Sequence, residues 1–314
     1  MDNGPSSQED KKTVPATNPS STGHEEAQAQ RCPIGEHSTY DEFYQYYAEE
    51  SLRPEAIARF RSIQGLIMRV RHNEGLDARS LDVADIGCGA GTQALLWAVG
   101  GHRVCGLDIS EQLVELARKR ASESVLAADF RLGSALRLPW PDESMDICLV
   151  IELLEHVSQW QVCLRECARV LRPMGILFLT TTNALCPFQE EFNLPLYGWY
   201  PRSVKRYFER LAKTKRPDLA NYATYPAINW LNFYSIRSFL QPVGLHCLDR
   251  FDLIDAENKT RVARFVISCI RSIPPLRFMA HLTSHSTTLL AIKSKEPGSY
   301  GTSGISLFRN RILG

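Results

Sequence analysis

The fold of this chain is decided by one stretch of sequence, Val83-Ala84-Asp85-Ile86-Gly87-Cys88-Gly89-Ala90-Gly91-Thr92. An apolar run leads directly into three closely spaced glycines, and an apolar helical pattern follows at 92–99. A second apolar run, 103–107, then ends in Asp108. This order of strand, glycine turn, helix and strand ending in an acid is typical of a nucleoside-binding unit. The glycines let a ligand approach bare backbone, and the carboxylate can accept hydrogen bonds from both hydroxyls of a ribose.

The spacing of these glycines differs from that of dinucleotide-binding turns, which read Gly-x-Gly-x-x-Gly. Gly87 and Gly89 fit that pattern, but Thr92 occupies its third glycine position and Gly91 comes one residue early. Asp85 would also repel a pyrophosphate, whereas it would suit a cationic ligand. The stretch resembles motif I of the class I S-adenosylmethionine (SAM) methyltransferases, in which an acid precedes Gly-x-Gly-x-Gly. The resemblance implies that SAM is the cofactor.

Apolar runs alternate with helical patterns from residue 81 to residue 180. Because each run is nearly continuous, we expect a parallel sheet that is covered on both faces. After residue 183 the alternation stops, and a loop rich in Pro, Tyr and Trp leads to a basic helix at 202–213. We therefore predict an α/β fold. It is a Rossmann-like, doubly wound, mostly parallel seven-stranded sheet with helices on both faces and a helical lid after strand five.

Composition predicts how the chain is divided. Residues 1–35 carry few large apolar side chains, so we expect a disordered tail there. A second flexible tail is expected at 296–314. The class I methyltransferase domain is predicted at 36–295, divided into a core at 78–183, a lid and substrate region at 184–243, and C-terminal strands and helices at 244–295.

Charge and cysteine usage limit the possible partners. The formal net charge is +1, which predicts no general attraction to nucleic acid. The sequence contains no run of 18 apolar residues and no apolar N-terminal segment, so we expect neither a membrane span nor a secretory signal. Nine cysteines without a Cys-x-x-Cys pair indicate buried, reduced thiols. These features favour a cytoplasmic protein.

The cofactor residues are expected at the carboxyl ends of the strands, where such sheets bind ligands. These ends supply the predicted cofactor-binding set: Asp85, Gly87, Cys88, Gly89, Gly91, Asp108, Ile109, Ser134, Ala135 and Ile151. Ile109 is placed to flank an adenine ring. The methyltransferase family usually carries Asp at the position of Ser134, where it accepts a hydrogen bond from the adenine amine. A serine hydroxyl can accept that bond more weakly.

The segment Glu152-Leu153-Leu154-Glu155-His156 follows strand four. Together with Leu171-Arg172-Pro173-x-Gly175, it resembles the ubiquinone-biosynthesis O-methyltransferase family. The resemblance covers about residues 80–183, and short segments near 233 and 243. It implies methyl transfer to a small-molecule acceptor and favours a hydroxyl oxygen, either phenolic, quinol-like or lipid-like. Methylation of RNA or protein, and a SAM-binding protein without catalysis, stay open as alternatives.

His156 is the predicted base, because an imidazole can take a hydroxyl proton as the acceptor attacks. It could instead be a helix-start histidine held by backbone contacts. Glu152 and Asn183 are predicted to support catalysis, although a helix cap and a turn would explain them equally. Glu152, Glu155 and His156 could together bind a divalent cation. A metal is not favoured, because some relatives with the same letters need none.

Two features suggest further contacts. Helices at 202–213 and 261–277 are expected to be amphipathic and basic, so each either packs an apolar stripe on the domain or meets an anionic lipid interface. The sequence thus leaves a peripheral membrane contact open. The tyrosines of the N-terminal region could close over the sulfonium, or pack on the domain: Tyr40, Tyr44 and Tyr47. One of Arg53, Arg59 and Arg61 could bind the cofactor carboxylate. The oligomeric state is not predicted.

Overall fold

The computed structural model describes residues 49–76, 80–124, 126–189, 192–220 and 227–295. Both predicted tails, 1–35 and 296–314, lie outside the described residues, and so do the three N-terminal tyrosines.

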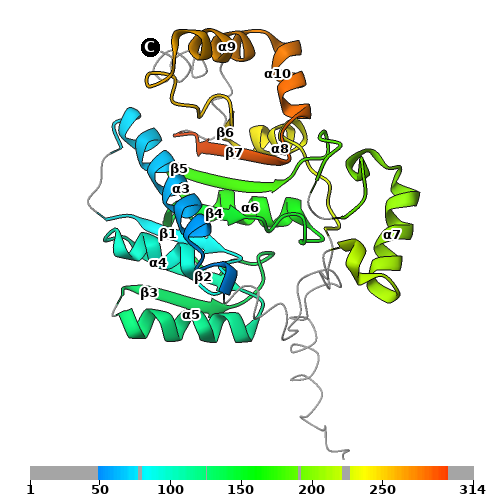
Figure 1. The fold of residues 1–314 in the computed structure, drawn as a ribbon. Coiled ribbons are helices and arrows are strands. Elements are labelled where there is room, and N and C mark those ends of the chain that lie inside the picture. The colour runs from blue at the N-terminus through cyan, green and yellow to red at the C-terminus, as the bar shows by residue number, and fades with distance from the viewer. Residues whose placement is uncertain (1–48, 77–79, 125, 190–191, 221–226, 296–314) are drawn as a thin grey trace, which may run out of the picture. The chain divides into compact units, whose positions relative to one another are not determined.

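Seven strands form one sheet in the order β3-β2-β1-β4-β5-β7-β6 (Figure 1). They are β1 (Asp82–Ile86), β2 (Arg103–Asp108), β3 (Ala128–Leu132), β4 (Met145–Ile151), β5 (Leu171–Thr182), β6 (Leu245–Asp249) and β7 (Ser286–Lys293). Strands β1 to β5 pair in parallel, and β7 is antiparallel to both β5 and β6. The predicted α/β fold with a mostly parallel seven-stranded sheet is confirmed. The strand order reverses between β1 and β4, which opens a crevice at their carboxyl ends.

Helices cover both faces of the sheet. One hydrophobic cluster contains residues of α3 (Pro54–Asn73), α4 (Thr92–Val99) and α5 (Glu111–Ser124). The other contains residues of α6 (Trp160–Val170) and α8 (Phe233–Leu240). Strand β4 contributes Ile147 and Leu149 to the first cluster, and Cys148 and Val150 to the second. Alternate side chains of a strand point to opposite faces, so a continuous apolar run is what a strand buried on both sides requires.

Local contacts set the ends of two elements. Helix α6 ends at Val170, because Leu171 already pairs with Met145 as the first residue of β5. Strand β6 ends at Asp249. There the Asp249 carboxylate accepts the backbone N–H groups of Phe251 and Asp252, at 2.8 and 3.1 Å, which turns the chain out of the sheet.

Two helical segments interrupt the regular alternation. After β5 come η1 (Tyr197–Trp199), α7 (Arg202–Thr214) and η2 (Pro217–Ala220), which share a separate small apolar cluster. After α8 the chain forms η3 (Gln241–Val243). Helices α9 (Arg261–Ser272) and α10 (Pro274–Leu282) lie between β6 and β7 in the chain (Figure 1). Within the described residues, no helix is both long enough and apolar enough to cross a membrane.

Candidate active site

A pocket with about 1000 Å³ of empty space, open solvent included, lies at the carboxyl ends of β1, β2 and β4. The structure brings most of the predicted site residues to its wall: Asp85, Gly87, Cys88, Gly89, Asp108, Ile109, Ala135, Ile151, Glu152 and His156. Their placement is as expected from the rule that parallel sheets bind ligands at this edge. The roles assigned to them stay predictions.

The glycine turn is held to the end of β2. The backbone N–H groups of Gly87 and Cys88 both donate to the carbonyl of Leu107, at 2.8 and 3.0 Å. The Asp108 carboxylate accepts the N–H of Gly89 at 2.8 Å and that of Ser110 at 2.9 Å. Asp108 therefore faces the same cavity as the glycines and fixes the turn beside it. A carboxylate has about four acceptor positions, so it can still accept further hydrogen bonds from a ligand.

Two predicted cofactor residues are not part of the pocket wall. Gly91 has φ +77°, and a Cβ there would lie 2.8 Å from both Ala117 Cβ and Phe130 Cζ. A glycine is therefore required at position 91 because Ala117 and Phe130 pack against it, and not because a ligand approaches the backbone there. The hydroxyl oxygen of Ser134 accepts the N–H of Leu136 at 3.2 Å. Its neighbours Gly133 and Ala135 line the pocket instead.

Two buried side chains of the pocket wall each carry a polar atom without a partner among the described residues. Asp85 is 3% exposed, and its Oδ2 has no hydrogen-bond partner among the described residues. Burial, and then repulsion from Asp108, raise the pKa of Asp85 to about 7. Gln93 is 5% exposed, and its Nε2 is equally without a partner in the described structure. An acceptor and a donor of this kind together match the ammonium and carboxylate of an amino acid.

Gln93 was missed by the sequence analysis, although a signal for it exists. It is the second residue of α4, the helix that begins directly after the glycine turn. The first turn of that helix adjoins the ligand site. A long polar side chain at this position therefore indicates a ligand contact. Ser51 and Phe60 also line the pocket without having been predicted.

The edge of the pocket carries an ion pair. Glu152 directly follows β4 and has φ +52°, a left-handed conformation that is uncommon outside glycine. Its carboxylate forms a bidentate contact with the guanidinium of Arg59 on α3, the second bond being 3.1 Å long. Of the three arginines considered for the cofactor carboxylate, the pocket wall includes Arg59. Because the pair is about half exposed, it contributes little to stability.

The three possible metal ligands do not converge. Glu155 is 2% exposed and accepts the hydroxyl of Thr181 at 2.8 Å, whereas Glu152 contacts Arg59. Glu155 is not part of the pocket wall, although His156 is. Within the described residues, no three His, Cys, Asp or Glu side chains are grouped so as to hold a metal ion.

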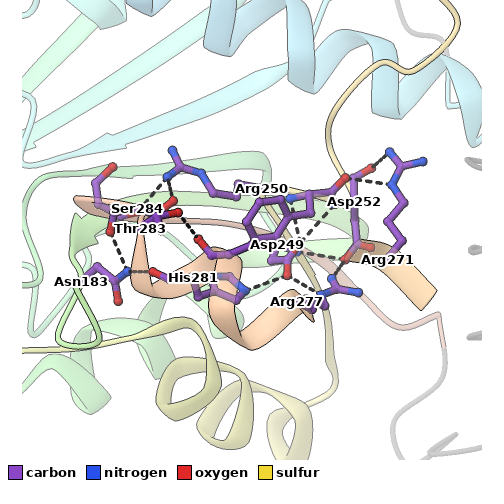
Figure 2. A network of polar contacts seen from close by, with 12 residues as sticks. Asn183, Asp249, Arg250, Asp252, Arg271, Arg277, His281, Thr283 and Ser284 are labelled. Carbon is purple, nitrogen blue, oxygen red and sulfur yellow. Dashed lines mark hydrogen bonds and ion pairs between the residues drawn. The ribbon is translucent and has the colours of Figure 1, made fainter. Parts of the chain in front are cut away.

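The side chain of Asn183 is held outside the pocket wall by its hydrogen bonds. It is 1% exposed, and its amide donates to the carbonyls of His281 and Ser284, at 2.8 and 2.7 Å (Figure 2). Its Oδ1 accepts the N–H of Leu185 at 3.1 Å. Asn183 does not line the pocket. The structure therefore assigns it to joining the end of β5 to α10, and does not bring it to the predicted catalytic position.

Comparisons with known proteins agree with this geometry. Residues 84–179 match a family model described as a methyltransferase domain. The ubiquinone biosynthesis O-methyltransferase of Chelativorans sp. (strain BNC1) is 34% identical over 144 residues, which are 44% of this chain and 54% of that protein. The protein of the same name from Agrobacterium fabrum is 35% identical over 150 residues, or 45% and 58% of the two chains. The match thus spans little more than half the length of these relatives.

A solved structure extends the likeness in fold. The PH0226 protein from Pyrococcus horikoshii OT3 aligns with a TM-score of 0.51 and 16% identity, over 82% of this chain and 100% of that one. At this identity the likeness shows the shared fold alone. Taken with the domain match and the strand order, it identifies residues 84–179 as the core of a class I methyltransferase domain, a family whose cofactor is SAM.

Proposed function

We propose that this protein transfers the methyl group of SAM to a hydroxyl oxygen of a small-molecule acceptor. The observation that carries the proposal is a single pocket with two matching halves. Asp108 fixes the glycine turn at one half, and Asp85 and Gln93, each with one buried polar atom that lacks a partner in the described structure, lie in the wall of the same pocket. A nucleoside joined to an amino acid needs both halves, and SAM has this composition.

The residues present fit the cofactor. Asp108 would accept hydrogen bonds from the ribose hydroxyls, which are donors that a carboxylate binds strongly. Asp85 would accept from the methionine ammonium, and the Gln93 amide would donate to the methionine carboxylate. Each of the last two contacts satisfies a buried polar atom that is otherwise left without a partner. When bound, SAM supplies a methyl group that its sulfonium already activates.

In this proposal the acceptor binds at the His156 side of the pocket. His156 lies in the segment that follows β4, and it lines the pocket wall together with Leu153 and Val157. There His156 would take the hydroxyl proton of the acceptor at its imidazole, and SAM, when bound, would supply the methyl group. The protein otherwise positions the two reactants and excludes water. The names of the curated relatives support a hydroxyl acceptor.

Calorimetry with S-adenosylhomocysteine and with NAD tests cofactor choice. Binding of the first without the second is expected, and the reverse would refute the proposal. A panel of phenols and quinols, incubated with enzyme and deuteromethyl-labelled SAM, then tests transfer by mass spectrometry. Transfer to RNA or protein alone would point to a macromolecular substrate, and cofactor binding without any transfer would point to a non-catalytic protein.

The role of His156 needs its own variant. His156→Ala should lower kcat about 100-fold or more while leaving cofactor affinity within about twofold, because a general base acts only on the chemical step. His285→Ala is the matched control, since His285 is exposed and lies outside the pocket wall. Unchanged turnover in His156→Ala would remove this residue from catalysis.

A further inference from the structure

Helices α9 and α10 carry an apolar face that points outward. Val262, Phe265 and Val266 recur at helical spacing on one side of α9, and their exposed fractions are 74%, 70% and 48%. Four large apolar residues that follow are also exposed by 43% or more: Ile273, Leu276, Phe278 and Met279. In an ordinary surface helix such a stripe faces the core. Exposed large apolar side chains gathered on two neighbouring helices are typical of a contact surface.

Buried charges decide this orientation. Arg277 of α10 forms ion pairs with Asp249 and Asp252, and His281 Nε2 lies 2.9 Å from Asp249 Oδ2 (Figure 2). Arg271 of α9 donates to the carbonyls of the loop after β6. Because these polar side chains attach the helix pair to the sheet, the opposite, apolar side of α9 is left toward solvent. These polar contacts leave the apolar stripe of α9 largely exposed.

The charged side chains of α9 and α10 themselves are all basic, whereas three acids, Asp252, Asp255 and Glu257, lie in the loop before α9. The sequence contains no Asp or Glu between Glu257 and Glu296. Lys259, Arg261 and Arg264 are exposed next to the stripe. An amphipathic helix with apolar residues on one face and cations at its border binds the interface of an anionic bilayer.

A second copy of the chain fits this face less well. A two-fold contact through this face would bring Arg261 and Arg264 of both copies into one interface, and α9 and α10 supply no acid to pair with them. We propose that the face formed by α9 and α10, centred on Val262, Phe265 and Val266, docks on an anionic lipid bilayer. This inference does not depend on the proposed reaction.

Vesicle flotation tests the docking with the full chain and without any methyl transfer. We expect the protein to float with vesicles of equal parts phosphatidylcholine and phosphatidylglycerol, to float poorly with phosphatidylcholine alone, and to be released by high salt. Val262→Ser with Phe265→Ser should weaken binding at least tenfold. Arg261→Gln with Arg264→Gln should weaken it about 30-fold, at roughly a tenfold loss per 1.4 kcal/mol and 1 kcal/mol per cation.

Two variants elsewhere control for general surface effects. Val99→Ser removes an exposed apolar side chain of α4, and Lys119→Gln removes an exposed cation of α5. Both should float as the unaltered protein does. The proposal is overturned if the unaltered protein ignores anionic vesicles, if the controls lose as much binding as the α9 variants, or if light scattering shows that Phe265→Ser converts a dimer into a monomer. Activity on a water-soluble acceptor should be unchanged in the α9 variants.

Discussion

Asp85 links cofactor binding to pH, and Asp85→Asn is the perturbation that exposes this link. In the folded protein its pKa is raised to about 7, first by burial and then by the neighbouring Asp108. Below that pH the side chain is mostly protonated and cannot pair with an ammonium. We therefore expect a ligand carrying the methionine group to bind more tightly as the pH rises toward neutrality, and to release a proton from Asp85 as it binds.

The size of the effect follows from the ionised fraction. With a pKa of about 7, about half of Asp85 is ionised at pH 7, but only about 3% at pH 5.5. If the ligand binds the ionised form alone, its affinity falls about 15-fold over this interval. The α-amino group of the ligand adds little to the pH dependence of the affinity, because such a group titrates at about 7.7–8.0 and so stays mostly protonated between pH 5.5 and about 7.

Calorimetry with S-adenosylhomocysteine measures this dependence directly. Titrations in two buffers of different ionisation enthalpy give the number of protons released, and affinity is followed from pH 5.5 to about pH 7. Asp85→Asn should bind more weakly at neutral pH and lose most of the slope. A flat profile in the unaltered protein, or a full slope retained in Asp85→Asn, would refute the assignment of Asp85 to the ammonium.

The raised pKa of Asp85 also predicts how the free energy of unfolding depends on pH. Its pKa of about 7 in the folded protein exceeds the unfolded value of about 3.9. The stability it contributes is therefore complete below about pH 4 and is lost as the pH rises through about 7, by an amount of up to about 4 kcal/mol. Without ligand, Asp85→Asn should accordingly unfold at higher urea concentration than the unaltered protein at about pH 8.

Three further predictions concern other residues of the site. Gly91→Ala should lower the free energy of unfolding by about 1–3 kcal/mol more than Gly101→Ala in urea titrations, because both have positive φ but only the first Cβ meets neighbours; equal losses would contradict the packing argument. Asp108→Asn should weaken S-adenosylhomocysteine binding about 10- to 100-fold, at about 1.5–3 kcal/mol per charged hydrogen bond, with an unaffected Kd as the contrary result. Asn183→Ala should cost about 1–3 kcal/mol of stability by leaving buried carbonyls unpaired, yet retain kcat at low temperature; a selective loss of kcat would restore its catalytic assignment.

The sequence by itself determined the sheet, the glycine turn and the acid at the end of β2. These are local features: a doubly buried strand needs a continuous apolar run, and a sharp turn beside a ligand needs glycine. The sequence alone therefore predicts that Gly87, Gly89 and Asp108 share one pocket. The carboxyl-end rule for parallel sheets also brought Asp85 and His156 to the same cavity.

Only the tertiary structure decided which polar side chains face that cavity. Asn183 follows β5 as expected, but carbonyls about 100 residues later in the chain bind its amide, and no local pattern reveals them. Gln93 faces the pocket because of how α4 packs. Likewise, the sequence predicted that α9 is amphipathic, whereas the buried partners of Arg271 and Arg277 determine that its apolar side faces outward. Periodicity fixes what a helix can bury, and contacts distant in sequence fix what it does bury.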